Sequence, residues 1–369
     1  MNAKTRVASS VAVVAMALAV PVSTAQQKPS EAYSSAVASY VAGDFDKASD
    51  VLASLPHRDI EEQVTASVQA IRTNSGSEGA RKRLEAMAVL HTEFALFADL
   101  EPDAARFHVD MAHLALTIDR KEALTPAARP RAETFLPRWC AVASSVLLLH
   151  ALEQQASACV EETLKLFPED REMLFWRGVV LEFSAVWRGQ PVIDPHSTNP
   201  SMARANPAGY DMLSNSRIWV PVEDAYRHLL ALEPDQHEAR LHLGYALYSL
   251  RRYTDAKVEL DAARDHARDP FVAYMASLFK ARLEEEQRDL DGAARDYEGA
   301  MAIMPGAQNA YMGLSLLEAR RGNATRARDL VAKFAAIPER SRVRDPWWEY
   351  HGGRVPIQDL EWLRKAVRQ

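Results

Sequence analysis

The chain has 369 residues, of which 48% are hydrophobic and 25% are charged, the composition of a soluble globular protein. Its formal net charge of −6 argues against a nucleic-acid partner, which would require a concentrated basic face. Glycine is sparse, at 14 residues, and this favours a helical chain.

Residues 1–25 have the pattern of a secretory signal peptide. Lys4 and Arg6 precede an apolar stretch at residues 7–20, and small residues follow as far as Ala25, near which we expect cleavage. The apolar stretch is shorter than the roughly 20 residues that span a bilayer, so an uncleaved anchor is the less favoured alternative. We therefore expect a periplasmic or secreted protein, with no integral membrane span after the signal is removed.

Residues 26–136 are predicted to form an N-terminal helical region with weak repeats. Helices are expected over residues 59–73, 78–100 and 104–120, with Pro102 ending the second of them. Three prolines follow within residues 124–137, and they argue against a full helix there. A first helix pair is indicated by small and apolar residues at Ala36, Gly43, Phe45, Ala48 and Leu52.

Residues 137–336 contain the clearest pattern, in which proline, small residues and apolar anchors recur about every 34 residues. Small side chains such as Gly178 and Gly244 allow antiparallel helices to approach closely. Units are expected to open at Pro137, Arg171, His237, Tyr274 and Gln308. The proline-rich residues 189–220 are predicted to be a non-helical insertion between the two helices of one unit.

This pattern resembles the tetratricopeptide repeat family in a divergent form, because Leu174, Arg240 and Ser277 stand where the family has tryptophan. The resemblance implies an all-α fold, a right-handed superhelical solenoid of antiparallel helix pairs. Residues 337–369 are expected to be a C-terminal cap and tail. Their last helix, from about residue 356 to 367, would cover the apolar end of the solenoid.

In that family, ligands usually lie in a concave groove lined by the first helix of each pair. Transferring the family's groove positions one by one predicts an aromatic and apolar lining made of Phe175, Val179, Phe183, Leu241, Tyr245, Tyr248, Leu278, Arg282 and Met312. Such a lining suits a helix or an extended segment. The resemblance therefore implies a scaffold that binds a protein or peptide, and one setting for it is an envelope assembly.

A second hypothesis is a structural subunit whose groove is filled from within. Aromatic residues near the C-terminus, Trp347, Trp348 and Tyr350, or the insertion at residues 189–220, could occupy the lining. Exposed apolar patches of this size seldom stay uncovered, so the sequence leaves both hypotheses open.

The sequence contains no recognisable catalytic, cofactor or metal motif. His237 and His242 are five residues apart, whereas a zinc pair on a helix requires a separation of four. The spacing of His108 and His113 fails in the same way. We therefore predict that the protein is not an enzyme and holds no cofactor. A third hypothesis keeps a catalytic or metal site in the insertion, whose polar residues are Asp194, His196, Asn199, Asn206 and Asp211.

The only cysteines, Cys140 and Cys159, are expected to lie on the two helices of one unit. Antiparallel packing would place Cys140 opposite residues nearer Thr163. This misalignment predicts two buried free thiols rather than a disulfide.

Overall fold

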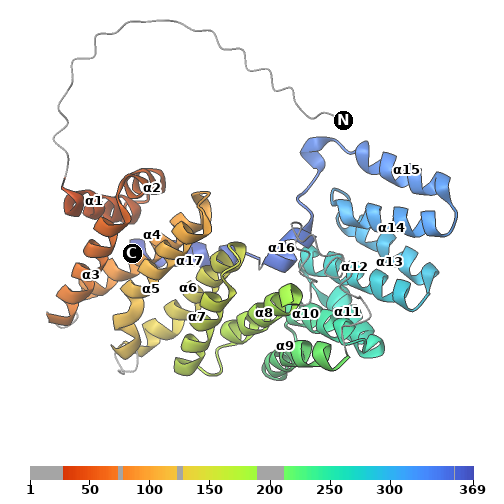
Figure 1. Cartoon of the computed structure of the whole chain (residues 1–369), viewed down its shortest axis with the longest axis horizontal. Coiled ribbons are helices and arrows are strands. Elements are labelled where there is room, and N and C mark those ends of the chain that lie inside the picture. Colours follow the sequence, from red (N-terminus) through yellow and green to blue (C-terminus); the bar gives the residue numbers. More distant parts are fainter. Residues whose placement is uncertain (1–27, 74–77, 123–127, 189–211, 353) are drawn as a thin grey trace, which may run out of the picture.

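The computed structural model describes residues 28–73, 78–122, 128–188, 212–352 and 354–369 (Figure 1). Every regular element in these ranges is a helix, which confirms the all-α prediction for the described part of the chain. No helix among them is both long enough and apolar enough to cross a bilayer.

The helices follow one another in pairs along a row (Figure 1). The N-terminal half contains α1 (Pro29–Val41), α2 (Phe45–Ser54), α3 (His57–Thr73), α4 (Glu78–Phe97), α5 (Pro102–Glu122), α6 (Arg129–Leu149) and α7 (Glu153–Leu166). The C-terminal half contains α8 (Arg171–Arg188), α9 (Met212–Leu232), α10 (His237–Ser249), α11 (Tyr253–His266), α12 (Pro270–Glu286), α13 (Leu290–Ile303), α14 (Gln308–Arg320) and α15 (Ala324–Ala335). The tail contains a 3-10 turn (Glu339–Ser341), α16 (Pro346–Gly352) and α17 (Ile357–Arg368).

Five helix pairs share one turn geometry between their first and second helix. One residue in each turn has a positive φ, between 58° and 96°: Gly43, Ala151, Arg251, Arg288 and Gly322. The next residue donates its N–H to the carbonyl five positions back, as Arg252 does to Leu247 at 2.9 Å. This bond satisfies a carbonyl that the helix end would otherwise leave unpaired. Because the α1–α2 turn has the same form, the repeat geometry extends into the N-terminal region.

The small residues of the repeat lie where neighbouring helices touch, as predicted. A Cβ atom added to Gly178 on α8 would collide with the Tyr226 ring of α9. One added to Gly244 on α10 would lie 2.7 Å from Cγ of Leu260 on α11. Neither glycine is needed for its backbone conformation, so their function is to permit close helix packing.

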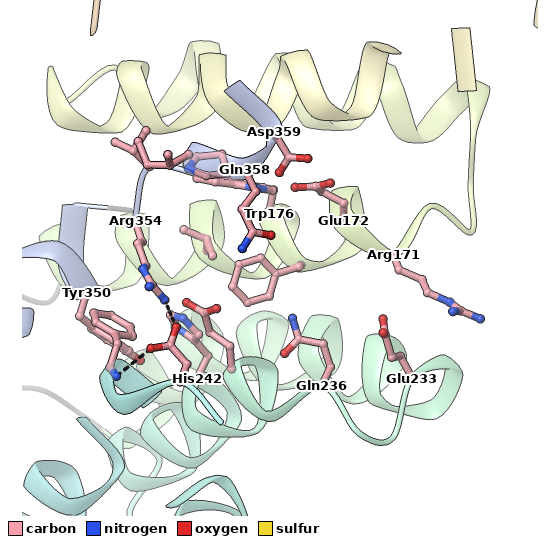
Figure 2. Close-up of a pocket in the computed structure, with 18 of the residues that line it drawn as sticks. Arg171, Glu172, Trp176, Glu233, Gln236, His242, Tyr350, Arg354, Gln358 and Asp359 are labelled. Atoms are coloured by element: carbon pink, nitrogen blue, oxygen red, sulfur yellow. Dashed lines mark hydrogen bonds and ion pairs between the residues drawn. The ribbon is translucent and has the colours of Figure 1, made fainter. Parts of the chain in front are cut away.

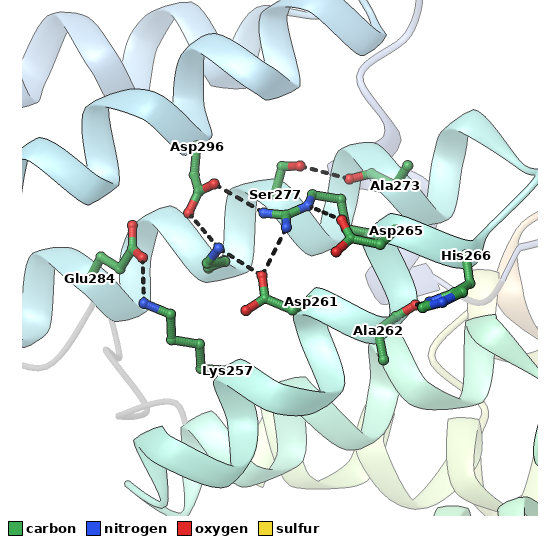
Figure 3. A network of polar contacts seen from close by, with 11 residues as sticks. Lys257, Asp261, Ala262, Asp265, His266, Ala273, Ser277, Glu284 and Asp296 are labelled. Carbon is green, nitrogen blue, oxygen red and sulfur yellow. Dashed lines mark hydrogen bonds and ion pairs between the residues drawn. The ribbon is translucent and has the colours of Figure 1, made fainter.

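A network of charged side chains joins successive pairs in the C-terminal half (Figure 3). Lys280 on α12 lies with its Nζ 2.7 Å from Asp261 of α11 and 3.4 Å from Asp296 of α13. Arg264 on α11 also contacts both carboxylates, at 3.0 and 3.2 Å. The buried ammonium group is therefore compensated, and the network ties α11 to the pair that follows.

Two proline-based predictions were wrong. α6 begins at Arg129 and continues through Pro137, so the domain boundary predicted at residue 137 lies inside a helix. Pro130 stands in the first turn, where no backbone partner is lost. Pro137 removes one helical hydrogen bond, but every side chain from Phe135 to Leu148 except Arg138 is buried, and this packing outweighs the loss.

The predicted insertion also ends earlier than expected. α9 begins at Met212 and includes Pro221, so residues 212–220 are helical, whereas residues 189–211 lie outside the described part. Trp219 is buried and packs edge-on against Tyr245 at a ring distance of 5.4 Å. Through Trp219, the start of α9 therefore packs against α10.

The prediction of two free thiols was wrong, because Cys140 on α6 and Cys159 on α7 form a disulfide with their Cα atoms 6.1 Å apart. Cys159 lies one helical turn before Thr163, which was the expected neighbour. Cys140 of α6 therefore faces a residue of α7 that lies one helical turn nearer to the connecting loop than Thr163, the expected neighbour.

The tail forms the predicted last helix but not at the predicted place. After α15 the chain turns back, and α16 lies against α12 and α6 (Figure 1). α17 then packs against α6 and α4 in the N-terminal half. Instead of covering the end of the solenoid at α15, the tail runs along the inner face, which we define as the surface formed by the first helices α6, α8, α10, α12 and α14.

Candidate functional site

The nine residues predicted to line a groove all lie on first helices of the inner face. Leu241 and Leu278 are fully buried in the hydrophobic core, and Val179 and Phe183 are nearly so. The partly exposed members are Phe175, Tyr245, Tyr248, Arg282 and Met312. The partly exposed members of the predicted set are therefore four apolar side chains, three of them aromatic, and one arginine, and the tail covers the centre of the surface that they form.

Tyr350 of α16 occupies that centre. Its ring stacks on His242 of α10 at 4.6 Å and meets Phe279 of α12 edge-on at 4.9 Å. Tyr245 contacts it edge-on from α10 at 5.7 Å. With 3% of its surface exposed, Tyr350 is as buried as a core residue.

Trp347 lies one helical turn before Tyr350. The guanidinium of Arg282 stands 4.0 Å from the centre of its ring, within the range of a cation–π contact, and Phe279 flanks it at 5.7 Å. The predicted groove residues Tyr245 and Arg282 thus contact two of the three tail aromatic residues that the self-filled hypothesis named. The side chain of Trp348 lies outside the described part.

Asp345 fixes the start of α16. Its carboxylate accepts hydrogen bonds from the Tyr274 hydroxyl, from the backbone N–H and side-chain amide of Asn309, and from the N–H of Trp347, at 2.7 to 3.0 Å. It therefore caps α16 and ties the helix to α12 and α14 at once.

The histidine on which Tyr350 stacks contacts a buried carboxylate, Glu182. Glu182 of α8 is 2.8 Å from Nδ1 of His242 and accepts a hydrogen bond from the Tyr226 hydroxyl at 3.3 Å. Burial, reinforced by Glu182, raises the pKa of both Tyr226 and Tyr350 well above the usual value, so both hydroxyls stay protonated. The cluster holds the imidazole plane in the orientation on which Tyr350 stacks.

Beside these aromatic contacts is a pocket of about 890 Å³ between α8, α10 and the tail (Figure 2). Phe175 and Trp176 form its wall on α8, and His242 and Glu238 belong to α10. From the tail, Arg354 reaches Asp269, and its Cζ lies 4.6 Å from the centre of the Phe271 ring. Both charged and aromatic side chains therefore line the pocket.

Carboxyl groups dominate one end of the pocket. Glu172 of α8 shares a hydrogen bond with Asp359 of α17. Burial, followed by the charge of Asp359, raises the pKa of Glu172 to about 8, so that Glu172 is protonated at neutral pH. Asp359 also pairs with Arg138 of α6 at 3.2 Å. The contact between α8 and the tail thus depends on a proton.

α17 holds the tail in the N-terminal half. Arg364 forms a two-point ion pair with the buried Glu93 of α4, to which Tyr40 of α1 also donates at 2.7 Å. Leu360 and Leu363 are buried against the helices beneath. This end of the tail is anchored by charge and by apolar burial together.

Sequence reasoning missed several of these residues. His242 was considered only as a metal ligand, and Phe279 lies next to a transferred groove position without being one. Asp345 carried a usable signal, because an aspartate before Pro346 is a typical helix start. Nothing in the sequence indicated the Arg364–Glu93 pair, whose members are 271 residues apart.

The histidines of the described part do not gather into a metal site. Within the described ranges, no group of three or more His, Cys, Asp or Glu side chains is arranged to hold a metal ion. His91 and His108 are 2.8 Å apart between their Nδ1 atoms, and Tyr33 contacts His91 at 2.9 Å. Burial lowers the pKa of both histidines, that of His108 to about 4, so the pair is neutral at pH 7. The insertion residues Asp194 to Asp211, where a catalytic site was considered, lie outside the described part.

Comparisons with known proteins identify one segment of this repeat pattern and several solved structures with a similar fold. Residues 223–273 match the family described as tetratricopeptide repeat, and none of the curated proteins matches the sequence. Similar solved structures include MamA, 18% identical over 49% of this chain and 80% of its own, with a TM-score of 0.35. PilF of Pseudomonas aeruginosa is 13% identical over 64% of this chain and 90% of its own, with a TM-score of 0.43. Yeast Tom70 is 13% identical over 88% of this chain and 60% of its own, with a TM-score of 0.37. The match to the tetratricopeptide repeat family covers α10 and α11 and their flanks, and it agrees with the helix-pair arrangement of the fold.

Proposed function

We propose that the protein is an exported, non-enzymatic scaffold that binds a partner protein on its inner face. The observation that carries the proposal is the seating of Trp347 and Tyr350 on the predicted groove residues Tyr245 and Arg282. These contacts support the proposal, because a segment with aromatic side chains, here the chain's own tail, packs on the inner face. Helix-in-groove recognition uses the same kind of contact.

The same observation also favours a second candidate, a structural subunit with a permanently filled groove. Tyr350 is 3% exposed and Asp345 is 5% exposed, values typical of a core rather than of a weakly held segment. The two candidates differ in whether a partner ever reaches the half-buried residues that flank the tail.

Export is supported by the sequence of residues 1–25 and by the disulfide of Cys140 with Cys159, since disulfides persist in oxidising compartments. Cell fractionation and the N-terminal residue of the mature protein would test it. A mature chain that starts near Gln26 in the periplasm is expected, and an intact Met1 in the cytoplasm would contradict export.

The test of partner binding is site-specific photo-cross-linking in the native cells. A photoreactive phenylalanine replaces Tyr248 or Met312 on the inner face, and a control replaces Val258, which is 62% exposed on α11. We expect the inner positions, but not the control, to cross-link to another protein. If the inner positions cross-link only within the chain, the structural-subunit candidate replaces the scaffold.

A further inference from the structure

We infer that residues 345–354 are an internal copy of the motif by which the partner is recognised, an inference that rests on the proposed function. The partner's motif would have an aromatic residue, a second aromatic residue three positions later and an arginine four positions beyond that. In this chain the three are Trp347, Tyr350 and Arg354. The partner binds by displacing α16 from the inner face.

The receiving surface is built without the tail. Tyr245 stacks on Phe279 at 4.5 Å, and Trp219 from α9 contacts Tyr245 at 5.4 Å. His242 stacks on Tyr226 at 5.2 Å and is held by Glu182. These contacts join α8, α9, α10 and α12 to one another, so the surface is preformed and a ligand need not order it.

Each motif residue meets a chemically distinct set of partners, and Phe279 contacts both Trp347 and Tyr350. Trp347 packs against the guanidinium of Arg282. Tyr350 packs against the rings of His242, Phe279 and Tyr245. Arg354 forms an ion pair with Asp269 and a cation–π contact with Phe271. The three subsites therefore select an aromatic, an aromatic and a cationic side chain, in that order.

The subsites bind unequally, and this makes the segment displaceable. The Arg354–Asp269 pair is 40% exposed on both sides, and exposed ion pairs contribute little to stability. α16 has only seven residues, so it adds little helix stability of its own. The tether adds to the contacts of Tyr350 and Asp345, at an effective concentration on the order of millimolar. The anchor of α17 on Glu93 is separate and keeps the tail attached when α16 leaves.

The test uses the full-length protein and a fluorescent peptide with the sequence of residues 343–356. A Trp347→Ala/Tyr350→Ala variant empties the aromatic subsites, and circular dichroism and thermal melting check its fold. We expect the peptide to bind this variant and to bind the wild type about 100-fold more weakly, because the tethered tail competes there. A peptide with Tyr350→Ala or Arg354→Glu should bind at least about tenfold more weakly than the unmodified peptide.

A matched pair of arginine variants locates the binding. Arg282→Ala in the emptied variant should weaken peptide binding, whereas Arg320→Ala on the exposed part of α14 should not. If the double variant does not fold, Arg354→Ala in the full chain replaces it, and millimolar peptide should then speed hydrogen exchange of the α16 amides. Failure of the folded variant to bind the peptide, or equal binding by wild type and variant, would overturn the inference.

The outcomes separate this inference from the proposed function. Cross-links from Tyr248 or Met312 to a partner, together with no peptide binding, would refute the motif alone. If the peptide binds but Tyr248 and Met312 cross-link to no partner, the proposed scaffold function is refuted. A wild-type protein that forms dimers by exchanging tails would assign the motif to a second copy of this chain and overturn a foreign partner.

Discussion

The two halves of the solenoid differ in whether glycines stand at the contacts between helices. In the C-terminal half, glycines at contact points receive large neighbours, as Gly244 receives Leu260 and Gly313 receives Tyr297. No described glycine of the N-terminal half has such a neighbour. Buried carboxylates paired with arginines occur in both halves, as Glu85 with Arg131 and Glu223 with Arg252, each at 2.6 Å. The glycines recur at the repeat spacing in the sequence, whereas the buried Glu–Arg pairs do not. Only the glycines therefore reveal the repeat in the sequence.

The difference has a consequence for the tail. Glu93 in the N-terminal half is compensated by Arg364, which the tail supplies, and Arg131 also donates to the Ala366 carbonyl at 3.2 Å. The N-terminal half thus depends on α17, whereas α8 to α15 contain their own network of ion pairs. Loss of the tail anchor should affect the two halves unequally.

The largest effect is expected from Arg364→Ala. It leaves Glu93, with 1% of its side chain exposed, without its cation, and breaking a buried pair costs about 3–5 kcal/mol. Denaturant unfolding would measure the loss, and hydrogen exchange should place it in α1, α4 and α17. Arg58→Ala is the control, because its pair with Glu62 is exposed, and it should cost less than about 1 kcal/mol. Equal losses in both variants would contradict an unequal dependence on the tail.

A smaller effect, confined to the C-terminal half, is expected from Gly244→Val. The added side chain meets Leu260 of α11, and overpacking of this kind costs about 1–3 kcal/mol. Gly299→Ala on α13 is the matched control, since nothing lies within 4 Å of its Cβ position. Replacing that helical glycine should stabilise the protein slightly. A tolerated Gly244→Val would show that close approach of α10 and α11 does not hold this half together.

The smallest effect is a pH dependence that links the halves through Glu172. Its raised pKa means that the folded state holds a proton which the unfolded state releases, so the stability due to this group falls as pH rises from about 4.5 to about 8. Glu172→Gln should therefore match the wild type at pH 5 and be more stable at pH 9. We expect a difference on the order of 1 kcal/mol, because the pocket is open to solvent and screens the repulsion. Thermal melts at both pH values measure it, and a difference that does not change with pH would contradict the shared proton.

Sequence reasoning reached the parts of the structure that follow from local spacing. Gly178 and Gly244 revealed close helix contacts, and the register that they set placed Tyr245 and Arg282 on the inner face. It failed at Pro137, where burial of α6 outweighs a lost hydrogen bond, and at Cys159, where one helical turn decides whether two thiols meet. The path of the tail could not be read, because Glu93 and Arg364 meet through the fold and neither residue has a local signal.

The central feature of this molecule is a tail that lies across the inner face. Cross-linking from Trp347 tests this most directly. A photoreactive phenylalanine in place of Trp347 in the purified protein, followed by mass spectrometry, would identify its neighbours. We predict cross-links within one chain to the peptide that carries Phe279 and Arg282. Cross-links to α15 alone, or none to α12, would show that the tail covers the end of the solenoid and that the inner face is empty.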